Sequence, residues 1–192
     1  MSQSIRGTET EKNLLKAFAG ESQARNRYTY FASVAKKEGF VQISKIFIET
    51  AENEKEHAKI FFKYLEGGEV EVLASYPAGV INCTKANLEV SADGENFEWT
   101  SLYSNFAKIA IEENFPEIAS SFEQIAKVER FHEHRYRKLI NSLVINEVFS
   151  KKNNVKWHCM NCGYVFEGSI APAECPACKH PQSYFEILAE NF

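Results

Sequence analysis

Two Glu-x-x-His pairs, Glu54 with His57 and Glu129 with His132, are the most chemically suggestive feature of this 192-residue chain. On a helix, side chains three positions apart lie on the same face. Each pair can therefore present a carboxylate and an imidazole to one cation. Carboxylate oxygens combined with imidazole nitrogens suit iron or manganese better than copper or a pure calcium site.

Each pair follows a single glutamate on the preceding predicted helix. Glu21 precedes Glu54 by 33 residues and Glu95 precedes Glu129 by 34, which indicates a duplicated helix pair. These residues fall on the apolar stripes of their helices. A buried, unpaired carboxylate is unfavourable by several kcal/mol or takes up a proton, so a cation is needed to neutralise it. One Glu from each of two helices and Glu-x-x-His from each of two others is the ligand set of di-iron and di-manganese bundles.

Three further observations leave alternatives open. Glu98 is one carboxylate more than the minimal set requires, and it is either an additional ligand, an acceptor beside the ligands or a surface residue. Tyr28 lies on the stripe and is either a hydrogen-bond donor to a ligating carboxylate or a plain core residue. The remaining histidines fit no ligand pattern, and we expect structural or solvated roles for His134, His158 and His180.

Four of the five cysteines lie within the last 34 residues, as Cys159, Cys162, Cys175 and Cys178. Two Cys-x-x-Cys pairs predict one tetrahedral four-thiolate site, which both zinc and iron accept. A zinc ribbon is the structural alternative. The 12-residue gap between the pairs is shorter than the roughly 15 to 20 residues typical of zinc ribbons. That gap and the redox-capable bundle favour iron, with zinc an option on heterologous expression. Cys83 is expected to be a small buried hydrophobe.

The pattern of helix signals predicts a mainly α protein. Thr8 with Glu11 forms a capping box at the start of the first helix and Gly39 ends it. Asn114 and Pro116 supply the N-cap and first residue of the last helix. The four predicted helices span about 9–38, 41–66, from 93–96 to 114, and 116–149, with a crossover at 69–94. Short, long and short connections are typical of a ferritin-like four-helix bundle with one long crossover.

A polar segment at residues 150–154 (SKKNN) marks the predicted domain boundary. Residues 1–149 form the bundle, and residues 150–192 form a module too small to fold by hydrophobic burial alone. The module therefore needs its metal. Its expected core is Trp157, Tyr164, Phe166 and Phe185.

Composition excludes several classes of protein. The net charge is −4, with 22 Lys and Arg against 26 Asp and Glu, so there is no basic excess to bind nucleic acid. No apolar run approaches the roughly 18 residues of a membrane span, and the N-terminus lacks the apolar core of a secretory signal. The expected location is the cytoplasm, with no membrane partner.

Over essentially its whole length the chain resembles the rubrerythrin family. The matching stretches are Gly20–Tyr28 (GESQARNRY), Glu54–Ala58 (EKEHA), Glu95–Glu98 (ENFE), Glu129–His132 (ERFH) and the rubredoxin-like tail with its four cysteines. The resemblance implies a non-haem di-iron peroxidase that reduces hydrogen peroxide to water in oxidative-stress defence. A rubredoxin-type iron would pass electrons singly to the two iron ions in the bundle.

The resemblance also implies residue roles. The ligands of the oxidised site would be Glu21, Glu54, Glu95, Glu98, Glu129 and His132, and His57 would replace Glu98 on one iron in the reduced site. Tyr28 and Tyr103 match tyrosines that lie beside the ligands in the family. The implied assembly is a homodimer in which one chain's tail serves its neighbour's bundle, supplied by a redox protein or an NAD(P)H-dependent reductase.

Two other functions use the same residues. A ferritin-like ferroxidase or iron-handling protein needs the bundle but no electron-delivery module. A redox or metal sensor would use a zinc-ribbon tail to dock a partner.

Overall fold

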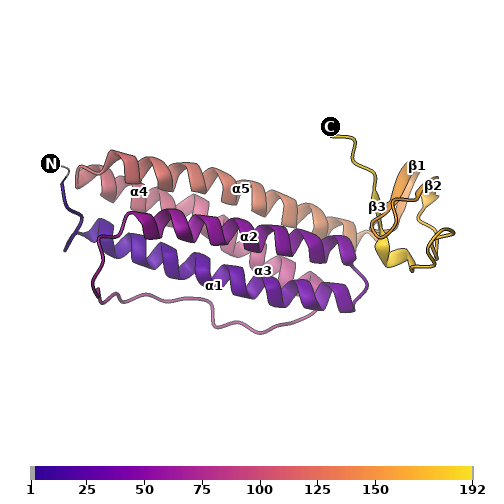
Figure 1. The fold of residues 1–192 in the computed structure, drawn as a ribbon, viewed down its shortest axis with the longest axis horizontal. Helices are drawn as coiled ribbons and strands as arrows, with labels where there is room; N and C mark the ends of the chain where they lie inside the picture. Colours follow the sequence, from indigo (N-terminus) through magenta and orange to yellow (C-terminus); the bar gives the residue numbers. More distant parts are fainter. Residues whose placement is uncertain (1–2, 192) are drawn as a thin grey trace.

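The computed structural model describes residues 3–191 and shows a four-helix bundle followed by a small β-domain (Figure 1). The first two helices are α1 (Glu9–Lys37) and α2 (Val41–Lys63). The third helical rod is built from α3 (Thr84–Phe97), a π-helical turn η1 (Glu98–Leu102) and α4 (Tyr103–Glu112). The fourth helix is α5 (Pro116–Val144). The predicted mainly α fold with one long crossover is confirmed.

Both ends of α1 follow the predicted signals. The Thr8 side chain accepts a hydrogen bond from the Glu11 backbone N–H, while the Glu11 carboxylate accepts one from Gly7 rather than from Thr8 itself. Gly39 has a φ of +85°, a left-handed conformation that glycine adopts without strain. The turn to α2 is therefore tight, and the two helices lie antiparallel (Figure 1).

The start of the third helix was predicted about ten residues too late. It begins at Thr84, and Gly94, which suggested a loop, lies inside the helix. The Glu38 carboxylate, from the end of α1, accepts the Thr84 backbone N–H at 2.9 Å. The Asn87 side chain bonds both backbone groups of Asn82. Because the capping carboxylate comes from 46 residues away, the local sequence does not reveal this helix start.

The continuous third helix predicted to residue 114 is also interrupted. At η1 the Tyr103 backbone N–H bonds the Glu98 carbonyl, an i→i+5 bond that accommodates one extra residue in the turn. Asn114 is not the N-cap of α5, because it takes a left-handed φ of 65° after α4, and Phe115 occupies the N-cap position. Pro116 is the first helical residue, as predicted, but α5 ends at Val144 rather than near residue 149.

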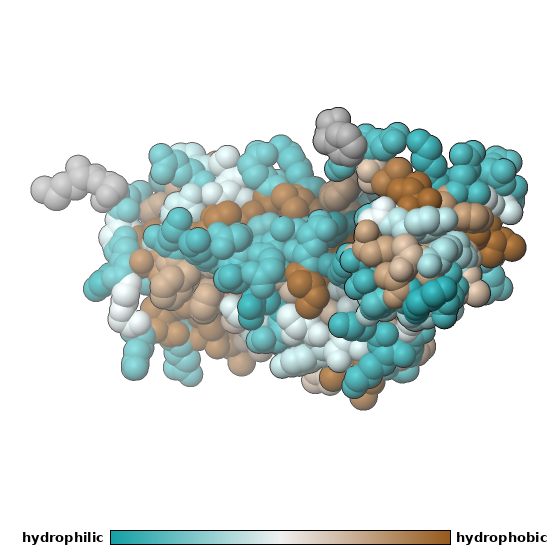
Figure 2. All heavy atoms as spheres, turned by 45° about the vertical axis from the view of Figure 1, so that its right-hand side comes forward, coloured by the Kyte–Doolittle hydropathy of each residue, from teal (hydrophilic) through white to brown (hydrophobic). Residues whose placement is uncertain are grey.

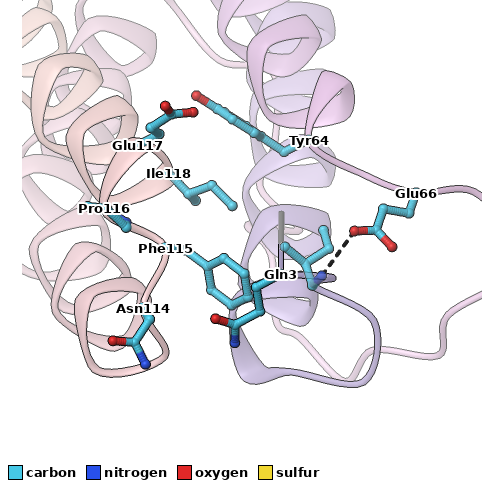
Figure 3. Close-up of a pocket in the computed structure, with 9 residues that line it drawn as sticks. Gln3, Tyr64, Glu66, Asn114, Phe115, Pro116, Glu117 and Ile118 are labelled. Atoms are coloured by element: carbon cyan, nitrogen blue, oxygen red, sulfur yellow. Dashed lines mark hydrogen bonds between the residues drawn. The ribbon is translucent and has the colours of Figure 1, made fainter. Parts of the chain in front are cut away.

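The segment before α1 closes one end of the bundle. The Ile5 backbone N–H donates to the Glu66 carboxylate at 3.0 Å, and Ile5 and Phe115 are both buried there (Figure 3). Glu113 caps α1 from the neighbouring rod, since its carboxylate accepts the backbone N–H groups of Glu9 and Thr10. A cavity of about 370 Å³ remains between Ile5, Tyr64 and Ile118, and no residue of the Glu-x-x-His pairs lines it.

The small domain is a three-stranded antiparallel sheet with strand order β2-β1-β3. The strands are β1 (Ser150–Cys159), β2 (Val165–Ile170) and β3 (Phe185–Ile187), with a 3-10 turn η2 (Gln182–Tyr184) before the last. Trp157 and Phe185 are fully buried, with Tyr164 and Phe166 packed partly buried against them, so the predicted core is confirmed.

The small domain contacts the bundle at the α1–α2 turn. Phe149, which precedes β1 and packs against the core of the small domain, stacks on Phe40 with ring centroids 6.3 Å apart. A Cβ on Gly39 would lie 3.7 Å from Ser183.

Hydrophilic side chains cover much of the face shown in Figure 2, with hydrophobic patches between them. Among residues 3–191, no helix is both long and apolar enough to cross a membrane.

Candidate metal centre

Six side chains from the four helical rods meet in the middle of the bundle as two overlapping groups of metal-ligating atoms. One group is Glu21, Glu54, His57 and Glu129, and the other is Glu54, Glu95, Glu129 and His132. Within each group the ligand atoms lie within 4.8 Å of one another. Glu54 and Glu129 belong to both groups, so two ions would share these carboxylates.

The two histidines stand in matching positions. His57 Nδ1 lies 2.8 Å from Glu54 and 2.9 Å from Glu129. His132 Nδ1 lies 3.1 Å from Glu54 and 2.8 Å from Glu129. The same i,i+3 spacing on α2 and α5 produces both arrangements, which gives the centre the approximate symmetry expected from the duplicated halves.

Two tyrosines hold the outer carboxylates. Tyr28 donates to Glu95 at 2.5 Å, and Tyr103 donates to Glu21. Both rings are buried. Burial, strengthened by the neighbouring carboxylates, raises the pKa of each phenol well above its usual value, so both stay protonated as donors. Of the two alternatives for Tyr28, the structure supports the hydrogen-bond donor.

The π-helical turn explains why Tyr103 faces the centre. The apolar stripe, read with an uninterrupted α-helical period, predicts Leu102 and Ile109 on the inner face. In the structure Tyr103 and Ala110 are buried instead, while Leu102 and Ile109 are only partly buried. The extra residue in η1 shifts the inward-facing register by one position, so that Glu95 before the turn and Tyr103 after it both reach the ligand cluster.

The site carries an excess of buried negative charge. Glu21, Glu54, Glu95 and Glu129 are each at most 1% exposed. Burial, together with repulsion from neighbouring carboxylates, raises the pKa of Glu21 well above its usual value and also raises the pKa of Glu95. Burial opposes protonation of the histidines, but contacts with Glu129 and Glu54 outweigh it and raise the pKa of His57 to about 10 and of His132 to about 12.

Unsatisfied polar atoms show that the residues fit metal ions. Buried oxygens of Glu21, Glu54, Glu95 and both oxygens of Glu129 have no hydrogen-bond partner, and neither does His132 Nδ1. The short distances of His132 to Glu54 and Glu129 are therefore ion-pair contacts without hydrogen-bond geometry. Atoms that face one another in this way are normally bridged by a cation. Two divalent ions would balance the four carboxylates.

Glu98 belongs to neither ligand group, whereas His57 belongs to the first. Glu98 lies close enough for its charge to act on Glu21. Burial raises the pKa of Glu98 itself well above its usual value, and repulsion from Glu95 and Glu129 adds to this effect. Its side chain nevertheless keeps more accessible surface than the four buried carboxylates. Of the predicted bundle ligands, Glu98 is the one that the structure leaves outside the two groups.

The four cysteines of the tail form the second centre. Their sulfur atoms all lie within 4.8 Å of one another, and Cys159–Cys178 and Cys162–Cys175 are each 3.7 Å apart. A tetrahedral ion with metal–sulfur bonds of about 2.3 Å places its ligands about 3.8 Å apart. The thiols are free rather than disulfide-bonded. The His180 backbone N–H lowers the pKa of Cys178 to about 6, which favours the thiolate that a metal requires.

Cys83 is exposed, so its prediction as a buried hydrophobe was wrong. The residue occupies the N-cap position of α3, at the surface end of the crossover, where the helix start that the sequence missed places it. As predicted, His134, His158 and His180 belong to none of the groups of metal-ligating atoms among the described residues. His180, for example, lies against the ring of Tyr184 and near the Cys178 carbonyl.

The sequence did not indicate several polar residues that contact the ligands or fix the helices that carry them. Asn53 Oδ1 lies 3.3 Å from His132 Nε2, which leaves Nδ1 to face the carboxylates. Glu133 accepts hydrogen bonds from Trp99 and Asn96 and thereby ties η1 to α5. Nothing in the residue types separates these polar side chains from solvated ones, although each lies directly beside a predicted ligand in the sequence.

Comparison with known proteins agrees with this geometry. Residues 12–140 match the family model described as Rubrerythrin, and residues 157–186 match the model described as Rubrerythrin, rubredoxin-like domain. A rubrerythrin of Porphyromonas gingivalis is 58% identical over 192 residues, covering 100% of this chain and 96% of that protein.

Solved structures show the same architecture. A fully reduced, all-ferrous nigerythrin aligns with a TM-score of 0.63 at 27% identity, covering 97% of this chain and 92% of that one. A bacterioferritin of Desulfovibrio desulfuricans aligns with a TM-score of 0.63 at 23% identity over 72% of this chain and 82% of that one, which shows a shared ferritin-like fold. The bundle holds the residues of a di-iron carboxylate site, and the tail holds those of a rubredoxin-like four-cysteine iron site.

The charge balance predicts opposite pH dependences with and without metal. In the metal-free chain the raised pKa values of Glu21, Glu95 and Glu98 mean that the folded state binds more protons than the unfolded state above pH 4.5, and the two histidines act in the same direction above pH 6.5. Stability therefore falls as pH rises. Each unit of pKa difference corresponds to about 1.4 kcal/mol. Calorimetry should show a Tm lower by several degrees at pH 8 than at pH 5.

The metal-loaded protein is the matched control for this experiment. Because its ligands must be deprotonated, metal stabilises the fold more as pH rises. The lowered pKa values of exposed carboxylates such as Glu52 and Glu66 act below pH 4.5 and do not enter this window. A metal-free Tm that rises from pH 5 to pH 8 would contradict the assignment of buried, uncompensated carboxylates.

Inserting one alanine between Leu102 and Tyr103 tests the register that the π-helical turn sets. One added residue rotates the rest of the rod by about 100°, so Tyr103 loses Glu21. We expect bundle iron to fall by at least half while tail iron is unchanged, measured as iron per chain together with the ferric-thiolate absorption. Thr100→Ala, which keeps the length, is the control, and circular dichroism reports any unfolding. Full iron loading of the insertion variant would show that the register of Tyr103 is dispensable.

Proposed function

The chain belongs to the rubrerythrin family, and from that premise we propose that it is a non-haem di-iron peroxidase that reduces hydrogen peroxide to water. The observation that carries the proposal is the pair of buried ligand groups that share Glu54 and Glu129, joined in one chain to a four-cysteine site. Reducing one hydrogen peroxide to two water molecules consumes two electrons and two protons. Two ferrous ions, when bound, supply both electrons and stabilise charge on both oxygens.

The protein's own residues set the geometry for this reaction. Glu54 and Glu129 would both contribute to holding two ions, and Glu21 and Glu95 would each contribute to holding one. Tyr28 and Tyr103 fix the outer carboxylates by hydrogen bonds. The site is closed to bulk water on the side of the four buried carboxylates, which strengthens every electrostatic interaction within it.

Charge balance supports an exchange between His57 and Glu98. Four carboxylates neutralise two divalent ions, and oxidation of both ions adds two positive charges. A fifth carboxylate then becomes favourable where a neutral imidazole was sufficient before. We propose that His57 serves the reduced centre and Glu98 the oxidised one. The position of His57 inside the first ligand group, with Glu98 beside it, supports this arrangement.

The place of the small domain supports electron delivery between two chains. It contacts the bundle at the α1–α2 turn. Glu54 lies 13 residues beyond Val41 along α2, which at about 1.5 Å per residue is roughly 20 Å of helix. We propose a homodimer in which the tail of one chain approaches the bundle of its neighbour, reduced in turn by a redox protein or an NAD(P)H-dependent reductase.

Stopped-flow oxidation of the fully reduced protein tests the peroxidase assignment. Hydrogen peroxide is expected to reoxidise the iron at least about tenfold faster than dioxygen at equal concentration. The reason is that one dinuclear centre holds both electrons that the reduction of hydrogen peroxide to water consumes. Faster oxidation by dioxygen, with many iron ions turned over into mineral, would favour a ferroxidase. A tail that holds zinc when purified anaerobically from its own cell would favour a sensor.

Glu98→Ala tests the proposed exchange. The variant should bind two bundle iron ions when reduced, because His57 remains, and should lose at least half of one ion per chain after oxidation. Iron content measured anaerobically in both states gives the answer, with Glu123→Ala as a control carboxylate exposed on α5. Equal loss of iron from both oxidation states would contradict the exchange.

A further inference from the structure

A cavity of about 350 Å³ lies beneath the crossover and extends to Glu98 and Tyr103, beside the metal centre. Its roof is the crossover segment 73–77, and its walls come from α1 and from the rod formed by α3, η1 and α4. We call it the crossover cavity. Glu98 and Tyr103 line it, whereas the four buried carboxylates do not. Glu98 and Tyr103 therefore connect the ligand cluster with a space near the protein surface.

The roof is anchored at two points and does not fill the space below it. Tyr76 donates its hydroxyl proton to the Lys16 carbonyl at 2.9 Å, and the Gln23 side chain donates to the Pro77 carbonyl at 3.2 Å. A Cβ on Gly20 would lie 3.7 Å from the Tyr76 ring. Leu73 has 94% of its surface exposed and does not fill the cavity, so Tyr76 is the large side chain of the roof that packs against α1.

Two polar side chains on α1 line the cavity one helical turn apart. Gln23 Oε1 and Arg27 Nε are buried atoms that have no hydrogen-bond partner among the described residues. One is an acceptor and the other carries a donor. The positive charge of Arg27 also acts on Glu98. Ala17, Leu102 and Phe106 make most of the remaining wall apolar.

We propose that the crossover cavity is the route by which hydrogen peroxide reaches the metal centre, with Gln23 and Arg27 as its hydrogen-bonding partners on the way. This inference rests on the peroxidase function proposed above. Hydrogen peroxide is small and both donates and accepts hydrogen bonds, so it matches the pair of free polar atoms. A volume of 350 Å³ holds several molecules of water size, each about 30 Å³.

Filling the cavity from two sides tests the route. Ala74→Trp adds bulk to the roof without disturbing the core, because Ala74 is exposed. Gly20→Met adds bulk from α1, with Gly20→Ala as an intermediate step in side-chain size. Ala78→Trp is the matched control, since Ala78 is on the same crossover and lines a neighbouring groove that shares Gln23 and Arg27 with the cavity but lacks Glu98 and Tyr103.

The expected second-order rate constant for peroxide oxidation of the reduced iron falls at least tenfold in Ala74→Trp. It falls progressively from Gly20 through Ala to Met, and stays within twofold in Ala78→Trp. A readout without turnover is azide binding to the Co²⁺-loaded protein, followed by cobalt absorption, whose association rate should fall in the same order. Arg27→Leu, which leaves the cavity open, should lower the peroxide rate severalfold.

The outcomes separate this inference from the proposed function. If peroxide fails to oxidise the wild-type centre, the peroxidase function is wrong, while the azide rates still report on the cavity. If peroxide oxidises the wild type and both Ala74→Trp and Gly20→Met match it in peroxide and azide rates, the cavity is not the route. A rate reduced as strongly in Ala78→Trp as in Ala74→Trp would also overturn the proposal.

Discussion

The burial of four carboxylates and two imidazoles at the centre of the bundle is the constraint on which the rest of the structure depends. Glu21, Glu54, Glu95 and Glu129 occupy positions that an ordinary bundle fills with leucine or phenylalanine. Their charge cannot be solvated there, so the carboxylates must take up protons or share cations. Aromatic and aliphatic clusters on both sides, which include Phe122 in one and Phe47 in the other, hold the helices around this polar layer.

The helices meet that constraint by different means. On α2 and α5 regular α-helical spacing is sufficient, because Glu and His three residues apart already share a face. The third rod has to direct Glu95, Glu98 and Tyr103 toward one region, which a regular helix would not do. The π-helical turn η1 resolves this by adding a residue, and Glu133 on α5 holds the turn through Trp99 and Asn96. The irregular element therefore lies where the chemistry requires a local departure from the helix period.

The two metal centres place different demands on the chain. The tail has a small core around Trp157 and Phe185, and its four cysteines form a site for one ion. The bundle has a large core and uses metal to neutralise its interior. Joining them in one polypeptide places a four-cysteine iron site and a di-iron carboxylate site on the same chain. The crossover, which links the two helix pairs, also covers the cavity that borders Glu98 and Tyr103.

The sequence by itself determined the features that depend on local spacing. The Glu-x-x-His pairs, the preceding glutamates, the two Cys-x-x-Cys pairs and the short turn at Gly39 all follow from helix and turn geometry within a few residues. Only the tertiary structure decided what depends on distant contacts. The start of α3 rests on Glu38, the register of Tyr103 rests on a turn braced by another helix, and the exposure of Cys83 follows from that helix start. A capping carboxylate or a brace from a remote segment leaves no periodic signal in the sequence, because its partner is chosen by folding rather than by spacing.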